Sequence, residues 1–149
     1  MNARYSHTNL IARDWRALAQ FYERVFACTP VPPERNYSGN DLEAGTGVEN
    51  ARLRGVHLLL PGHGERGPTL EIYQYEPEMK PIRPEVNRNG FAHIAFEVDD
   101  VAAARQMVVE NGGTPVGEIV TLKPGDRSVT WCYLRDPEGN IVELQSWSG

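Results

Sequence analysis

The first thirty residues change from a strand-like pattern to a helical pattern of apolar positions. Residues 5–12 have the length and composition of a strand. Asp14 follows as a candidate helix N-cap. After Asp14, large apolar side chains recur at helical spacing: Trp15, Leu18, Phe21, Tyr22, Val25 and Phe26. Prolines 30, 32 and 33 exclude a longer helix, so we expect one amphipathic helix that ends before them.

The middle of the chain is dominated by turn residues. Residues 36–50 are rich in Gly, Asn, Ser and acidic residues, which predicts a loop able to cover a site. Residues 52–60 and 69–75 are strand candidates, and a run of turn residues joins them. Residues 76–89 carry three prolines and are typical of a linker.

The second half begins with strict alternation. Over residues 91–98, the apolar even positions form one face and the odd positions, including His93, form the other. Asp99 or Asp100 then caps a helix that runs to about Glu110, where two glycines end it. Residues 128–135 and 141–147 are strand candidates on either side of the Asp136–Asn140 turn.

The two halves follow the same plan. His7 precedes Asp14 by seven residues, and His93 precedes Asp100 by seven residues. A Thr-Pro-Val tripeptide begins 22 residues after His7 and again 21 residues after His93. The halves end on Leu-Glu-Ile, containing Glu71, and on Val-Glu-Leu, containing Glu143. We therefore predict an internal repeat of two β-α-β-β-β modules, at about residues 4–76 and 90–148, within one domain of 149 residues.

Composition narrows the class of protein. Hydrophobic residues make up 40% and charged residues 23%, the balance of a globular chain. The net charge of −5 is spread along the chain without a Lys/Arg cluster, so we expect no nucleic-acid partner. No apolar run is long enough to span a bilayer, and the N-terminus lacks a signal-peptide pattern. Cys28 and Cys132 lack CxxC spacing, which predicts reduced thiols in a cytoplasmic protein.

Four residues form the candidate chemistry. His93, Glu71 and Glu143 each point away from apolar neighbours on their strands, and each taken singly is explained by a solvated outer face. If the modules pair about a pseudo-twofold axis, His7 becomes equivalent to His93, and Glu71 to Glu143. Two imidazoles and two carboxylates then converge as a set suited to Ni²⁺, Co²⁺, Mn²⁺, Fe²⁺ or Zn²⁺. Four ligands on an octahedral ion leave two positions for a chelating substrate.

These motifs resemble the vicinal oxygen chelate superfamily of glyoxalases, bleomycin resistance proteins and dioxygenases. The resemblance covers essentially the whole chain, and its most specific part is the segment Asp136–Leu144, which reads DPEGNIVEL. It implies an α+β fold in which two βαβββ modules form a cup-shaped mixed sheet around one divalent metal ion. It also implies a small-molecule substrate and, as is common in the family, a homodimer.

Within that superfamily, Glu71 favours the four-ligand members, which are similar to glyoxalase I and methylmalonyl-CoA epimerase. The resemblance implies a lyase or isomerase that transfers a proton next to a carbonyl, with the metal stabilising the enolate and Glu143 or Glu71 as the base. Two alternatives stay open. An extradiol-type dioxygenase or a thiol transferase has two His and one Glu without a carboxylate at the place of Glu71, and a resistance protein binds its ligand without catalysis.

Departures from the family pattern leave the substrate open. Ile11 and Tyr75 stand where glyoxalase I enzymes carry an arginine and an asparagine that hold glutathione, with Arg13 two residues beyond Ile11. Residues 54–57 occupy the place of an additional epimerase glutamate. Arg54 and Arg127 are candidates to meet an anionic substrate, whereas His57 and His63 have no counterpart in the repeat and are interpreted as structural or solvated. Further inner-face side chains predict a partly aromatic pocket: Tyr73, Tyr75, Trp131, Tyr133 and Trp147.

Overall fold

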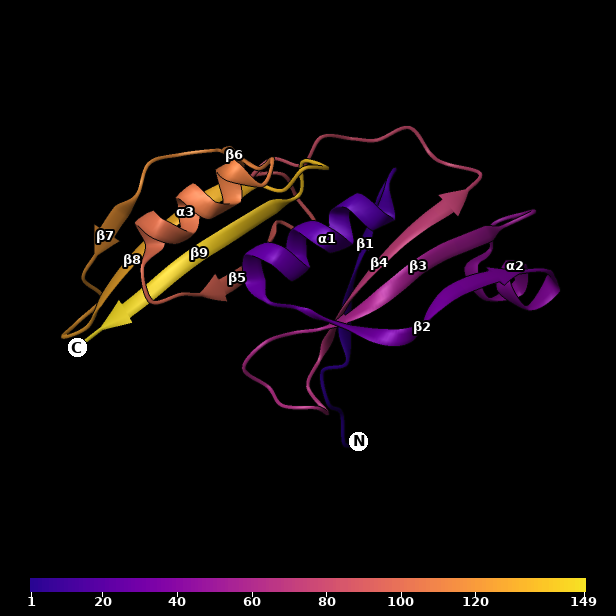
Figure 1. Ribbon diagram of the computed structural model, residues 1–149, viewed down its shortest axis with the longest axis horizontal. Coiled ribbons are helices and arrows are strands. Elements are labelled where there is room, and N and C mark those ends of the chain that lie inside the picture. The colour runs from indigo at the N-terminus through magenta and orange to yellow at the C-terminus, as the bar shows by residue number, and fades with distance from the viewer. The chain divides into compact units, whose positions relative to one another are not determined.

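The computed structural model describes residues Met1–Gly149, which divide into two compact units. The first unit spans Met1–Pro81 and the second Ile82–Gly149. Each unit contains one mixed sheet with a helix packed on it, so the α+β class and the βαβββ module predicted from the sequence are confirmed (Figure 1). The shared cup around a metal stays a prediction.

The first unit has a four-stranded sheet in the order β1-β4-β3-β2, in which β1 runs parallel to β4 and the other neighbours are antiparallel. Helix α1 packs on β3 and β4, and the short helix α2 follows β2 (Figure 1). The elements are β1 (His7–Ile11), α1 (Trp15–Phe26), β2 (Thr29–Ser38), α2 (Asn40–Thr46), β3 (Arg52–Leu59) and β4 (Thr69–Glu76).

The second unit repeats this order. Its sheet runs β5-β9-β8-β6, with β7 also paired to β8, and β5 is parallel to β9. Helix α3 lies against β8 and β9 (Figure 1). The elements are β5 (His93–Glu97), α3 (Val101–Glu110), β6 (Thr114–Pro115), β7 (Val120–Leu122), β8 (Ser128–Arg135) and β9 (Ile141–Ser148).

Both long helices begin at the predicted aspartates. The Asp14 carboxylate accepts hydrogen bonds from the backbone N–H groups of Arg16 and Ala17, and Asp100 accepts from those of Ala102 and Ala103. These bonds satisfy donors that have no partner inside the helix. Helix α1 buries the apolar stripe read from the sequence against the sheet: Trp15, Leu18, Ala19, Phe21, Tyr22 and Phe26.

Strand register confirms the internal repeat. Glu71 pairs with Asn9, two residues after His7, and Glu143 pairs with Ala95, two residues after His93. An equivalent backbone hydrogen bond follows the first strand in each module. Ala12 N donates to Tyr73 O, and Val98 N donates to Gln145 O, both at 2.8 Å. A histidine on the first strand and a glutamate on the last strand therefore have the same relative placement in each module.

One prediction is wrong. Residues 36–50 are not a loop, because β2 continues to Ser38 and α2 spans Asn40–Thr46. The prolines that end α1 lie inside β2, which is the last strand of its sheet and so tolerates residues without a backbone N–H. The β2–β3 register shifts between Val31 and Arg35, where these prolines interrupt the pairing. Strand β7 was also not anticipated.

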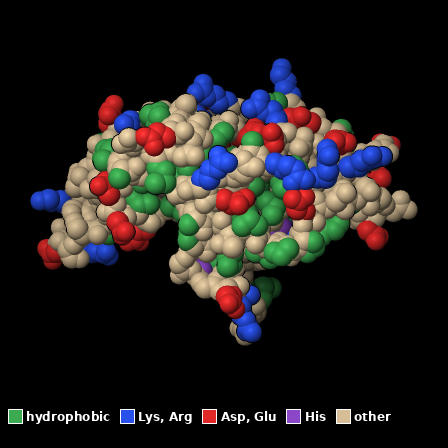
Figure 2. Space-filling view, in the orientation of Figure 1, with side chains coloured by type: hydrophobic (Ala, Val, Ile, Leu, Met, Phe, Trp, Pro, Cys, Tyr) green, Lys and Arg blue, Asp and Glu red, His purple; other side chains and the backbone are tan.

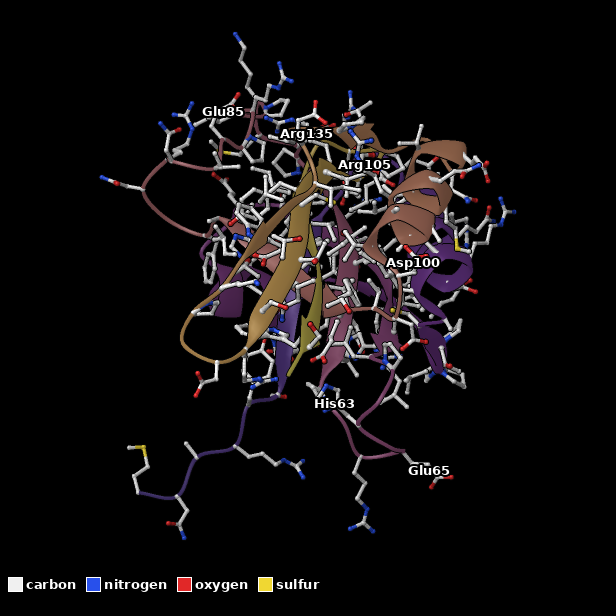
Figure 3. All side chains as sticks on the ribbon, turned by 90° about the vertical axis from the view of Figure 1, so that its left-hand side faces the viewer. His63, Glu65, Glu85, Asp100, Arg105 and Arg135 are labelled. Carbon is white, nitrogen blue, oxygen red and sulfur yellow. The ribbon has the colours of Figure 1, made fainter.

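The segment before β5 is attached to the sheet of its own unit by Arg135. This buried side chain donates to the carbonyls of Pro84 at 2.6 Å and Gly139 at 3.1 Å, and to the Glu85 carboxylate at 2.8 Å. Figure 3 shows Arg135 and Glu85 together at one end of the unit. The proline-rich stretch thus has fixed partners although it forms neither helix nor strand.

Surface charge follows the composition. On the face shown in Figure 2, acidic and basic side chains are interspersed. None of the three helices has the length and apolar composition needed to cross a membrane.

Candidate active site

The first module brings His7 and Glu71 together. Glu71 lies on β4 with its side chain opposite the buried Leu70 and Ile72, which face helix α1. Its Oε1 atom lies 3.5 Å from Nδ1 of His7, and only 12% of the Glu71 side chain is exposed. A carboxylate this enclosed requires polar partners, and it has them.

The second module builds the same pair from His93 and Glu143. The His93 Nε2 atom lies 2.9 Å from Glu143 Oε2, with the two side chains 31% and 15% exposed. Val142 and Leu144, the neighbours of Glu143 on β9, are fully buried on the opposite face. The four predicted ligands therefore occur as two His–Glu pairs, one in each module.

Whether the two pairs share one ion stays a prediction. The structure assembles no group of three or more His, Cys, Asp or Glu side chains in a metal-binding arrangement. The donor chemistry of each pair, one imidazole nitrogen beside one carboxylate oxygen, fits half of a mixed nitrogen and oxygen set for a divalent ion.

His57, which the sequence analysis interpreted as structural or solvated, lies beside the first His–Glu pair. It lies on β3 directly opposite Glu71, and its Nε2 atom is 3.3 Å from Glu71 Oε1 and 2.5 Å from the Tyr73 hydroxyl. On its other side, Arg35 Nη2 approaches His57 Nδ1 at 3.2 Å. In the sequence, His57 and Glu71 are odd-numbered residues of two separate strand candidates. Only the structure shows that they lie directly opposite each other in the β3–β4 pair.

A tyrosine lies on the same strand face as each glutamate. Tyr73 follows Glu71 by two residues on β4, and Tyr133 lies directly opposite Glu143 in the β8–β9 pair. Burial, followed by the nearby carboxylate, raises the pKa of both phenols above the ordinary value. Burial is also the main reason that the pKa of His57 lies below its ordinary value. At neutral pH these groups therefore lie near the carboxylates in their neutral forms.

The predicted aromatic lining is present around the second pair. The ring of Tyr133 lies 5.1 Å from that of His93 and 4.9 Å from that of Trp131, measured between ring centroids. Trp147 lies beneath the guanidinium of Arg127, which is 4.8 Å from its ring. Arg127 is thus placed on the same face as the aromatic residues.

Arg54, a candidate to bind an anionic substrate, does not share a strand face with His57. Strand alternation puts it on the face of β3 opposite His57, and it forms an exposed ion pair with Glu76 at 2.9 Å. His63 lies in the turn between β3 and β4, where Figure 3 shows it near the end of the unit beside Glu65. The interpretation of His63 as solvated agrees with its exposed position.

Comparison with known proteins identifies the family. Residues 4–144 match the family model of the Glyoxalase/Bleomycin resistance protein/Dioxygenase superfamily. A lactoylglutathione lyase of Salmonella typhimurium is 34% identical over 56 residues, which is 38% of this chain and 40% of the relative. The matched stretch thus spans less than half of that enzyme, and the same holds for the lactoylglutathione lyase of Salmonella typhi.

Solved structures show the same fold. A glyoxalase family protein from Bacillus cereus superposes with a TM-score of 0.86 at 19% identity, over 100% of this chain and 97% of that one. A fosfomycin resistance protein from Listeria monocytogenes, complexed with Mn(II) and sulfate, gives a TM-score of 0.52 at 18% identity, over 98% and 93%. At these identities the likeness concerns the fold alone.

Proposed function

The chain belongs to the Glyoxalase/Bleomycin resistance protein/Dioxygenase superfamily, and from that membership we propose that it is a divalent-metal-dependent lyase or isomerase. The reaction proposed is proton transfer at a carbon next to a carbonyl. The observation that carries the proposal is the duplicated His–Glu pair, His7 with Glu71 and His93 with Glu143. A pair that recurs at the same register in two modules provides four ligands, whereas the dioxygenase type needs only three.

We propose that these four side chains hold one Ni²⁺, Co²⁺, Mn²⁺, Fe²⁺ or Zn²⁺ ion. When bound, such an ion supplies a Lewis acid for the negative charge that develops on the substrate oxygen. The fosfomycin resistance protein, complexed with Mn(II), supports the choice of a divalent ion for this fold. The protein's own share is to orient the donors and to move the proton.

The proton would be carried by a glutamate, and Glu143 is the better candidate of the two. Glu71 has three polar neighbours, His7, His57 and Tyr73, whereas Glu143 has His93 and Tyr133. A carboxylate that alternates between ligand and base must be able to change its contacts during the cycle. The one with fewer partners does so at lower cost.

The substrate proposed is a small oxygenated molecule that meets a partly aromatic surface. Ile11, which stands where glyoxalase I enzymes carry an arginine, is apolar and 52% exposed at the end of β1, and this counts against the glutathione contact typical of those enzymes. Arg127 over Trp147 is the cation placed to meet a negative group on the substrate. We further propose that the working form is a cytoplasmic homodimer, which sedimentation analysis would test.

Metal analysis tests the proposal most directly. Protein purified without chelators from cultures supplemented with each candidate metal should carry about one divalent ion per chain after dialysis against a weak competitor. Glu143→Ala should retain little metal, because loss of a charged ligand weakens a site sharply. The matched control is Glu118→Ala, which removes an exposed glutamate from the same unit. Metal-free wild-type protein from every preparation would favour a non-catalytic binding protein instead.

The dioxygenase alternative is separated by oxygen consumption. Loaded with Fe²⁺ and given catechols, the protein should consume no oxygen above the rate of the Glu143→Ala and metal-free controls. Sustained, catechol-dependent oxygen uptake would overturn the lyase or isomerase proposal in favour of ring cleavage.

A further inference from the structure

Arg35 lies on the face of the first sheet that carries Glu71, which we call the site face. In the strand register Arg35 stands beside Gly55, and Gly55 stands beside Tyr73, which follows Glu71 by two residues on β4. The Arg35 Nη2 atom lies 3.2 Å from His57 Nδ1, and His57 Nε2 lies 3.3 Å from Glu71 Oε1. One imidazole ring therefore separates the guanidinium from the Glu71 carboxylate.

An irregularity in β2 directs Arg35 to this face. The register shifts between Val31 and Arg35, where β2 has two more residues than the facing stretch of β3. Extra residues of this kind bend a strand and change the direction of the side chains that follow. Glu34, just before Arg35, is held outside the site face by Arg16 of α1 through two hydrogen bonds of 2.8 and 2.9 Å. The next residue along the strand then points to the site face.

No acidic side chain forms an ion pair with Arg35. Its contacts are the backbone carbonyl of Pro33 and the ring of His57, whereas Glu34, its neighbour in the chain, is occupied by Arg16. A guanidinium has more N–H donors than these two contacts use. Arg35 is also partly buried, so water satisfies the remaining donors less fully than it would on an open surface. The side chain is thus suited to bind a negatively charged group from outside the chain.

The second module has no cation at the equivalent place. There Trp131 takes the position of Gly55, two residues before the one that lies opposite the glutamate, and its neighbour on the outer strand is Val120 of β7. The module fold therefore forms without a positive charge at this point. A requirement of the fold does not explain Arg35, and a ligand of the site face does.

We propose that Arg35 is a specificity-determining residue that binds a carboxylate group of the substrate. The inference rests on the proposed function, because it takes the site face as the place where the substrate binds. The planar guanidinium matches a carboxylate through two parallel hydrogen bonds. Since Arg35 stands one ring away from Glu71, the carboxylate belongs close to the oxygens that the metal would chelate. The substrate class is then a 2-oxo or 2-hydroxy acid, not a neutral carbonyl compound.

The test compares two probes that differ at one group. Hydroxyacetone and hydroxypyruvate share a hydroxyl group next to a ketone, and hydroxypyruvate carries a carboxylate in place of the methyl group. Their dissociation constants are measured on Co²⁺-loaded protein from the visible absorption of the bound ion. Arg35→Met should weaken hydroxypyruvate binding by about 10- to 100-fold, as expected for a lost hydrogen bond to a charged group, and leave hydroxyacetone binding unchanged. Arg35→Lys keeps the charge without the planar fork and should fall between them.

Two further variants locate the effect, and circular dichroism should show that all variants are folded. Arg54→Met removes an exposed arginine from the opposite face of β3 and should bind both probes as the wild type does. Arg127→Met removes the cation that lies over Trp147 in the second module. A loss of hydroxypyruvate affinity confined to Arg127→Met would overturn the assignment to Arg35. Equal losses for both probes in Arg35→Met would overturn it too, with the proposed function intact.

A second measurement needs no metal. In ¹⁵N-labelled metal-free protein, hydroxypyruvate should shift the Nε–H signal of Arg35 and hydroxyacetone should not, and the absence of this signal in Arg35→Lys identifies it. No shift at Arg35 would overturn the inference, whether or not the protein binds metal. A wild-type protein that binds no metal and still shows the shift would overturn the proposed function and leave carboxylate binding by Arg35 standing.

Discussion

Tyr133 lies opposite Glu143 in the β8–β9 pair at the register position that His57 occupies opposite Glu71 in the β3–β4 pair. The repeat has therefore kept its His–Glu pairs while the residue across from each glutamate has changed. In one module that residue is a phenol, and in the other it is an imidazole backed by Arg35. Two carboxylates in different surroundings can take different roles in one site.

The contact between Gly55 and Tyr73 gives a stability prediction. In Gly55→Ala the added methyl group would meet the Ile72 carbonyl oxygen at 2.1 Å and the Tyr73 ring at 2.5 Å. The backbone oxygen cannot move away without disturbing the β3–β4 pairing. We expect a loss of about 1 to 3 kcal/mol in the free energy of unfolding, measured by urea denaturation.

Gly45→Ala is the control for that substitution. Gly45 lies inside α2, and no atom lies within 4 Å of the place that an alanine Cβ would occupy. Alanine there should therefore leave stability unchanged or raise it by up to about 1 kcal/mol. Equal urea midpoints for the two variants would show that the β3–β4 pair tolerates the methyl group.

The periodic parts of the fold could be predicted from the sequence. Helix α1 begins and ends where its apolar spacing and Asp14 indicated, and β8 has the predicted bounds Ser128–Arg135. The internal repeat could be predicted because a strand, a capping aspartate and a helix follow one another in the same order in both halves. Local signals sufficed here because each element buries one face against a single neighbouring layer.

The errors occur where pairing partners matter more than local pattern. The predicted loop at residues 36–50 overlaps β2, which runs to Ser38. This strand tolerates its three prolines because the last strand of a sheet pairs on one side only. His57 was interpreted as structural or solvated because only the pairing of β3 with β4 places it opposite Glu71. The register between β3 and β4 depends on turn geometry and packing, and it cannot be read from a single sequence.

Asp136 gives a second stability prediction. Its buried carboxylate accepts hydrogen bonds from the backbone N–H groups of Glu138 and Asn140 and from the Asn140 side chain, at 2.9 to 3.0 Å. Asp136→Ala removes all three bonds and leaves the donors of the β8–β9 turn without this acceptor. We expect a loss of about 2 to 3 kcal/mol in the free energy of unfolding, measured by thermal and urea denaturation.

Two further variants make that result specific. Asp136→Asn keeps one acceptor oxygen and should fall between the wild type and Asp136→Ala. Asp126→Ala removes an exposed aspartate from the preceding loop and should be neutral. If Asp136→Ala unfolded at the same midpoint as Asp126→Ala, the turn would be held by its backbone alone.

The two cysteines should be unreactive in the folded protein. Burial raises the pKa of the Cys28 thiol to about 12 and also raises the pKa of Cys132, and both side chains are buried. The thiolate is the reactive form, so raising the pH from 7 to 9 should leave almost none of it on Cys28, and burial shields both side chains from the reagent. Ellman's reagent should label neither thiol in native protein and both in concentrated urea. Rapid labelling of a native thiol at pH 8 would contradict this account.

The last prediction separates the roles of the two glutamates. Glu143→Gln and Glu71→Gln each keep an oxygen donor while removing the basic carboxylate, so both variants should still bind Co²⁺. The probe is hydroxyacetone, a small ketone with two vicinal oxygens, and the readout is exchange of its α-protons with deuterated solvent followed by NMR. If the wild type catalyses this exchange, Glu143→Gln should slow it by roughly 10² to 10⁴, the usual effect of losing a general base.

Glu71→Gln should have the smaller effect, because the Glu71 carboxylate lies 3.5 Å from His7 and 3.3 Å from His57 and is proposed to remain on the metal. Glu118→Gln, at an exposed position of the second unit, should exchange protons at the wild-type rate. The reverse order, with exchange lost in Glu71→Gln and kept in Glu143→Gln, would make Glu71 the base. The carboxylate with the most partners would then be the one that moves, and the number of hydrogen bonds would not decide which glutamate carries the proton.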